Sequence, residues 1–116
     1  MRHGNHNRKF GLKRGKRRAL LVSLSSALIK NGKMTTTEAK AKEVRPFTEK
    51  LITKARTKNL ANIRLLSSRL KSKTLAMALV NEIAPKFVGR AGGYTRIIKL
   101  PRRKSDGAKM AIIEFV

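Results

Sequence analysis

The sequence predicts an α+β fold in which helices pack on a small mixed β-sheet of about three strands, with an extended basic arm at the N-terminus. Three observations support this prediction. Apolar residues recur at helical spacing through residues 19–83, β-branched residues concentrate in 94–116, and no acidic residue precedes Glu38. We therefore expect an N-terminal extension over residues 1–18 and a single globular domain over 19–116.

The first segment, residues 1–18, combines many cations with almost no apolar groups. Only Phe10 and Leu12 are sizeable apolar side chains after Met1, and glycines interrupt the run. Such a segment buries too little apolar surface to offset the entropy lost on ordering. It is expected to be disordered alone and ordered on its target.

The next two elements are predicted as helices. Apolar residues at helical spacing begin after Arg17, and Gly32 is a typical helix stop. A second helix is expected from about Glu38 to Arg56, capped by a threonine just before it. Pro46 lies inside this helix, and a kink or break is expected there because proline removes a backbone hydrogen bond.

Two further helices follow. Asn59 is predicted to open the third, which extends to Leu70, and Lys71 or Ser72 is expected to separate it from the fourth. The fourth is expected to end at Pro85.

The last third of the chain reads as a hairpin. Residues 94–100 and 110–116 are predicted strands, with Asp106-Gly107 as the turn. Because two strands alone are marginal, the threonine-rich segment 34–37 is expected to add a third. Ile98 and Leu100 are expected to meet Ile113 and Phe115 on one face.

Charge is the extreme property of the composition. Lys and Arg number 29 against 6 Asp and Glu, giving a net charge of +23 and an isoelectric point near 11.8. A dense polyanion relieves such self-repulsion, and nucleic acid is the usual one. The apolar runs are too short to span a bilayer, and the lack of cysteine fits a reducing, cytoplasmic location.

RNA contacts are expected at three places: the arm, the loop around two adjacent glycines, and the hairpin tip. Tyr94 could stack on a base or pack under the loop. The candidate RNA-binding residues are Arg2, His3, Arg8, Lys9, Lys13, Arg14, Lys16, Arg17, Arg18, Arg90, Gly92, Gly93, Tyr94, Arg96, Arg102 and Arg103.

Other classes of function have less support. His3 and His6 are nitrogen ligands, but no carboxylate or thiolate accompanies them, so we expect polar groups in an RNA-bound tail and no metal or cofactor. The scattered carboxylates and the absence of a nucleophile motif argue against an enzyme. A DNA-packaging protein and a membrane-surface protein remain alternatives, with neither DNA nor membrane the expected partner.

Several short motifs follow one another across nearly the whole chain in a familiar order and spacing. They are Met1-Arg2-His3, Leu28-Ile29, Thr36-Thr37, Ala41-Lys42-Glu43 with Arg45, Leu51-Ile52-Thr53 with Ala55, and residues 90–97. Together they resemble the bacterial large-subunit ribosomal protein seventeen family. The strongest likeness is in 90–97, which is similar to the family's signature before its final strands.

This resemblance implies a structural protein of the large ribosomal subunit, bound to 23S-type rRNA on the solvent side near the exit of the peptide tunnel. It also implies a role in subunit assembly, neighbouring large-subunit proteins as partners, and an α+β fold with a basic N-terminal arm. The chain departs from the family pattern at Lys16-Arg17-Arg18, where a stretch containing Ser or His is expected. It ends at Val116, without the C-terminal extension of some members.

Overall fold

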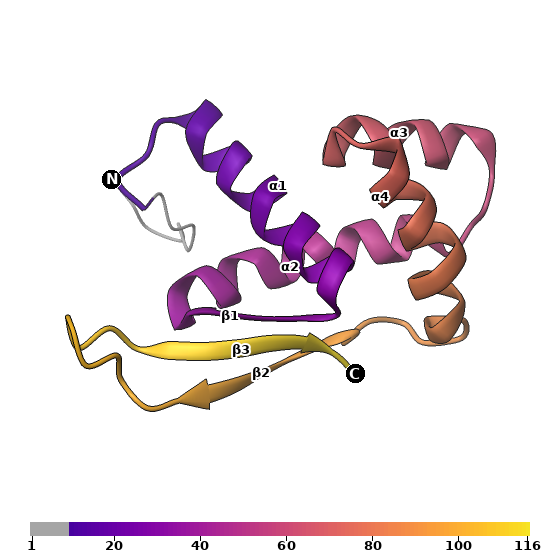
Figure 1. Cartoon of the computed structure of the whole chain (residues 1–116). Coiled ribbons are helices and arrows are strands. Elements are labelled where there is room, and N and C mark those ends of the chain that lie inside the picture. The colour runs from indigo at the N-terminus through magenta and orange to yellow at the C-terminus, as the bar shows by residue number, and fades with distance from the viewer. Residues whose placement is uncertain (1–9) are drawn as a thin grey trace, which may run out of the picture.

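A computed structural model describes residues 10–116, in which helices cover one face of a three-stranded sheet (Figure 1). The chain forms α1 (Arg14–Asn31), β1 (Lys33–Thr37), α2 (Glu38–Ala55), α3 (Leu60–Leu70), α4 (Lys73–Ala78), a π-helical turn η1 (Leu79–Ile83), a 3₁₀ turn η2 (Ala84–Phe87), β2 (Thr95–Leu100) and β3 (Met110–Phe115). The predicted α+β class is confirmed.

The sheet has the strand order β1-β3-β2, and both pairings are antiparallel rather than mixed. The segment 34–37 supplies the third strand, as expected. The predicted facing was wrong, however, because Ile113 lies opposite Ile97 and Phe115 lies opposite Thr95. Ile98 is 43% exposed and points away from the helices. Both strands contain two adjacent isoleucines, so the sequence does not reveal which one faces the core.

The first helix begins earlier than expected. Residues 14–18 form the start of α1, so the predicted end of the arm at residue 18 falls inside a helix. Gly32 ends α1 in a left-handed conformation with φ 81°, and its amide donates to the carbonyl of Leu28. The expected stop is therefore confirmed.

The second helix continues through Pro46, so the break that was one of the two predicted outcomes does not occur. Its first half buries Ala41 and Val44 against α1 and β3, and its second half buries Leu51 and Ile52 against α3 and η1. Because apolar contacts hold both halves, the loss of one amide hydrogen bond at exposed Pro46 is tolerated.

The caps of the remaining helices agree with the sequence pattern. The side chain of Thr37 accepts from the amide of Lys40, that of Asn59 from Asn62, and that of Ser72 from Leu75. Pro85 does not end the helical path, because it lies in the first turn of η2, which extends to Phe87. Proline is compatible with that position because its missing amide has no helical partner there.

Candidate nucleic-acid interface

Three adjoining cavities cross the helical side of the molecule. The first, about 370 Å³, lies between α1, α2 and α3. The second, about 630 Å³, shares Arg69 with the first, and the third, about 390 Å³, shares Ala91 with the second. They form one surface, which we call the basic groove. Its cations are Arg18, Lys50, Lys54, Arg56, Arg69, Lys71 and Arg90.

The groove has little compensating negative charge. Glu49 is the one carboxylate that lines these three cavities within residues 10–116. Its Oε2 already accepts from the amide and hydroxyl of Thr95, at 3.2 and 3.0 Å, and lies 3.6 Å from Nε of Arg45. The ion pairs found among residues 10–116 use other cations: Arg17, Lys42, Arg45, Arg96, Lys99 and Arg103. The groove therefore has an uncompensated positive potential, suited to a polyanion.

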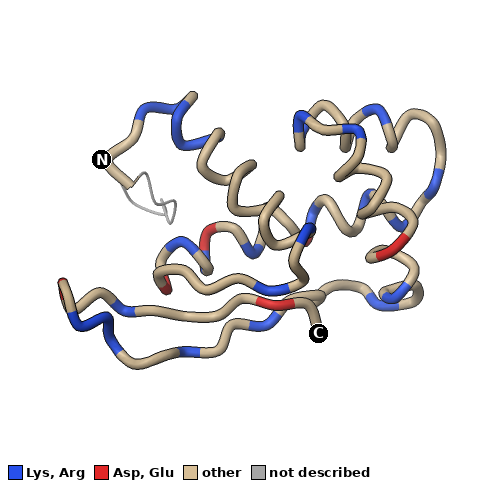
Figure 2. Tube along the Cα trace, viewed as in Figure 1, with Lys and Arg blue, Asp and Glu red and all other residues tan. Residues whose placement is uncertain are grey.

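Cations in the groove come from distant parts of the sequence. Figure 2 shows Lys and Arg positions on the start of α1, along α2 and at the end of α3. Lys50 and Lys54 are four residues apart on α2, and both are exposed. In the sequence, the signal for these helical cations is that the helices contain too few Glu residues to pair with all of them. Their union with Arg69 and Arg90 depends on the tertiary fold.

The loop formed by residues 88–93 is held from below. The hydroxyl of Tyr94 donates to the carbonyl of Arg90 at 3.1 Å, and Nη1 of Arg56 donates to the same oxygen. Gly93 has φ +64°, which a side chain would strain. The loop therefore presents its backbone and Arg90 at a fixed place in the groove.

Tyr94 is not available to RNA. It is 0% exposed, and its ring centroid lies 5.1 Å from that of Phe87. Of the two expected roles, packing under the loop is the one that the structure shows, and base stacking is excluded in this conformation. In the sequence, an aromatic residue flanked by glycines and arginines is compatible with base stacking and with packing under the loop. Only the fold separates the two roles.

The other predicted loop residues, Arg90, Gly92, Gly93 and Arg96, have three different placements. Gly92 lines the second cavity and Arg90 the third, so both belong to the basic groove. Gly93 supports the loop geometry, with its position close to the Arg90 guanidinium. Arg96 lies apart on the outer face of the sheet, where its Nε is 2.9 Å from Oε1 of Glu114.

The hairpin tip lies at the opposite end of β2 from this loop (Figure 1). Arg102 is exposed, and its Nη1 donates to the carbonyl of Gly107 at 3.1 Å. Arg103 donates to both carboxylate oxygens of Asp106, at 2.9 and 2.7 Å. These bonds, with help from the amide of Ala108, lower the pKa of Asp106 to about 2. Arg103 is thus a partly neutralised cation, and Arg102 is the better candidate for an RNA contact.

The predicted arm residues fall on both sides of residue 10. Arg2, His3, Arg8 and Lys9, together with His6, lie outside the described residues. Lys13 precedes α1, and Arg14, Lys16 and Arg18 are exposed on its first turns. Arg17 is partly buried, with Nη2 3.3 Å from Oε1 of Glu43. The cations of 14–18 are therefore fixed on a helix, and Arg18 is the one that lines the basic groove.

The described residues offer neither a cluster of metal ligands nor a helix that could span a membrane. Among residues 10–116, no group of three or more His, Cys, Asp or Glu side chains is placed to hold a metal ion. Within the same residues, every helix is too short or too polar to cross a membrane.

Comparison with known proteins identifies the family. A family model described as ribosomal protein L17 matches residues 20–116. The "Large ribosomal subunit protein bL17" of Gemmatimonas aurantiaca is 50% identical over 116 residues, which cover all of this chain and 98% of the relative. The protein of the same name from a Sulfurovum species is 51% identical over the full length of both chains, and that of Erythrobacter litoralis is 48% identical over all of this chain and 83% of the relative. This chain belongs to the ribosomal protein L17 family.

Proposed function

We propose that this chain is a structural constituent of the large ribosomal subunit and that it binds large-subunit rRNA through the basic groove. Its relatives are named as large-subunit proteins, and the family is one of ribosomal structural proteins, not of enzymes. The protein therefore acts by binding its partner through charge and complementary shape, and it is located on the ribosome.

The observation that supports RNA binding most directly is the groove itself. Seven cations from α1, α2, α3 and the 88–93 loop line its three cavities, and the single carboxylate among them is already bonded to Thr95. Phosphates placed along the groove would release counterions, which gives affinity that falls with salt. The affinity would come from neutralisation and fit, with no reaction.

Crosslinking of RNA segments follows from the separation of the basic surfaces. The loop edge of the basic groove and the exposed Arg102 at the hairpin tip lie at opposite ends of β2. One RNA segment in the groove and another at the tip would be held at a fixed distance by a sheet between them. Such a clamp, completed by the cations of the arm and by neighbouring subunit proteins, would support assembly of the subunit.

The position near the exit of the peptide tunnel, and attachment to 23S-type rRNA there, are proposed from the family resemblance. Crosslinking the bound protein inside purified large subunits and sequencing the attached RNA would test this position. Crosslinks confined to RNA far from the tunnel exit would contradict it.

The test of the function combines co-migration and competition. The full chain, expressed with a small tag, is expected to sediment with large subunits on a sucrose gradient. Purified protein is first bound to an rRNA transcript and then challenged with a competitor, either folded rRNA or duplex DNA. With concentrations counted in phosphates, folded rRNA is expected to release the protein at a far lower concentration than duplex DNA. Failure to co-migrate, or equal competition by the DNA, would contradict the proposal and favour a DNA-packaging role.

A further inference from the structure

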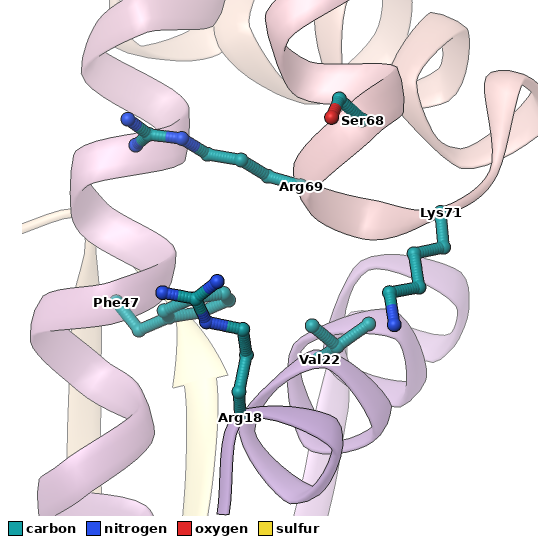
Figure 3. A pocket seen from close by; sticks show the side chains of 6 residues that line it. All are labelled: Arg18, Val22, Phe47, Ser68, Arg69 and Lys71. Atoms are coloured by element: carbon teal, nitrogen blue, oxygen red, sulfur yellow. The ribbon is translucent and has the colours of Figure 1, made fainter. Parts of the chain in front are cut away.

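The first cavity of the basic groove differs from the other two in its lining. It lies between α1, α2 and α3, and its six lining residues are Arg18, Val22, Phe47, Ser68, Arg69 and Lys71 (Figure 3). Phe47 is only partly buried, so part of its ring remains accessible. In the second cavity the aromatic residue is Tyr94, which has no exposed surface.

The cavity combines an apolar wall with a cationic rim. Val22 of α1 and Phe47 of α2 provide the apolar surface. Arg18 extends from α1 toward Phe47, and Arg69 extends from α3 toward α2 (Figure 3). Ser68 adds one hydroxyl, and none of the six lining residues is acidic. A free phosphate would contact the cations but not the apolar wall. An apolar side chain would contact the wall but not the three cations.

The turn between α3 and α4 fixes the third cation. Lys71 is the residue that ends α3, with φ +54°, and Ser72 caps α4 directly after it. A lysine is rarely found in this left-handed conformation, because its Cβ crowds the following carbonyl. The turn holds the Lys71 side chain over the cavity beside Val22 (Figure 3).

From this lining we propose that the cavity takes one unstacked nucleotide of the bound RNA. The inference rests on the proposed function and names the RNA feature that the groove recognises. The base would lie against Phe47 and Val22, with Ser68 bonding its edge, while Arg18, Arg69 and Lys71 hold the flanking phosphates. Proteins recognise single-stranded RNA in this way, by stacking splayed bases on aromatic rings and on arginine planes.

Size and continuity both favour a nucleotide within a polymer. The volume of about 370 Å³ is near the lower end of the roughly 300–1,000 Å³ typical of ligand cavities, which suits a single base. Arg69 also lines the second cavity, where Lys50 and Lys54 would take the next phosphates of the same strand. A free mononucleotide would leave these lysines without a partner.

Chemical probing of the pairing edges of bases on a large-subunit rRNA transcript, with and without the full chain, tests the proposal. The wild-type protein is expected to protect one unpaired base within a larger footprint. Phe47→Leu keeps apolar volume but removes the ring, and it is expected to weaken protection of that base at least about fivefold, the lower end of the loss seen when a stacking partner is removed. Ser68→Ala is expected to weaken protection of the same base.

Arg69→Gln and Arg64→Gln form a matched pair, because both remove one exposed cation from α3. Arg64 lies instead beside Leu60, Ile63 and Lys73, in a neighbouring cavity that meets the first one only at Ser68. With Arg69→Gln the base is expected to lose its protection from the probe, and with Arg64→Gln it is expected to stay protected. This comparison can be made even if Phe47→Leu fails to fold. An unchanged footprint with Phe47→Leu and Arg69→Gln would overturn the nucleotide pocket but not the proposed function, whereas no footprint for the wild-type chain would overturn the function.

Discussion

The guanidinium of Arg56 lies over the ring of Tyr94, with its central carbon 5.8 Å from the ring centroid. Both side chains also donate to one acceptor, the carbonyl oxygen of Arg90. A cation placed on an aromatic face is stabilised by the negative charge of that face. The pair thereby ties the end of α2 to the 88–93 loop, so that the loop edge of the basic groove is set by a buried tyrosine.

Replacement of Tyr94 by Phe is expected to loosen this loop while leaving the core packed. The ring contact with Phe87 persists, but the hydroxyl can no longer bond to Arg90 and Thr53. A decrease of about 1–3 kcal/mol in unfolding free energy is expected, since each bond contributes roughly 0.5–1.5 kcal/mol. Urea denaturation monitored by circular dichroism measures it, with an unchanged slope as the sign that the fold is retained. A change near zero would mean that water replaces the hydroxyl.

The hairpin tip is expected to respond to acid. Arg103 lowers the folded-state pKa of Asp106 to about 2, below its ordinary 3.8. A depressed carboxyl pKa means that the ion pair stabilises the tip fully above about pH 4 and that this stabilisation disappears as the pH falls through 2. Carboxyl carbon shifts measured by NMR should therefore show a midpoint near 2.

The matched variants for this titration are Arg103→Gln and Lys104→Gln. The first removes the group that donates to Asp106, so the midpoint is expected to rise toward 3.8. The second removes a neighbouring cation that makes no ion pair in the part of the chain that the structure describes, and the midpoint should stay low. A wild-type midpoint near 4 would contradict the pairing.

Two truncations separate the arm from the first helix. Deletion of residues 1–13 removes Arg2, Arg8, Lys9 and Lys13 but keeps all of α1. It is expected to weaken rRNA binding and to reduce the salt dependence, by about 0.7–0.9 in slope for each phosphate that the arm no longer neutralises. Unfolding should remain cooperative, with a midpoint close to that of the full chain.

Deletion of residues 1–18 also removes the start of α1, including Arg17, which pairs with Glu43. This longer truncation is expected to lower the unfolding midpoint as well as the affinity. Filter binding at several salt concentrations and thermal denaturation measure the two effects. Equal affinity of the full chain and the shorter truncation would show that the arm does not bind RNA.

Much of the fold could be predicted from local chemistry. Glycine at the end of α1, side-chain caps at Thr37, Asn59 and Ser72, and the Asp106-Gly107 turn each act through their own neighbours. A sequence displays such short-range signals directly.

The errors come from long-range packing. The start of α1 resembles an arm because its first turn is cationic, yet Arg17 reaches Glu43 on α2. Pro46 is accommodated because both halves of α2 are buried against different neighbours. Either Ile97 or Ile98 of β2 could face the core, and a shift of one residue would exchange them. Ile97 faces the core because it lies opposite Ile113 of β3.

The sequence points to some, but not all, of the cations of the proposed basic groove. Excess charge indicates a phosphate polymer, and Arg90 and Gly92 do lie at the groove. The sequence does not reveal that Arg18, Lys50 and Arg69 share one surface, because α1, α2 and α3 meet only in the folded chain. Tyr94, which the sequence offered as a residue that could stack on a base, is a core residue.

The basic groove, and not net charge alone, is proposed to bind rRNA. The most direct measurement compares two triple variants that each remove three exposed cations: Lys50→Gln, Lys54→Gln and Arg69→Gln in the groove, against Lys30→Gln, Lys33→Gln and Lys86→Gln outside it. At matched ionic strength, the groove variant is expected to lose at least about tenfold in affinity and roughly 2–3 in salt slope, and the control much less. Equal losses in the two variants would contradict the account.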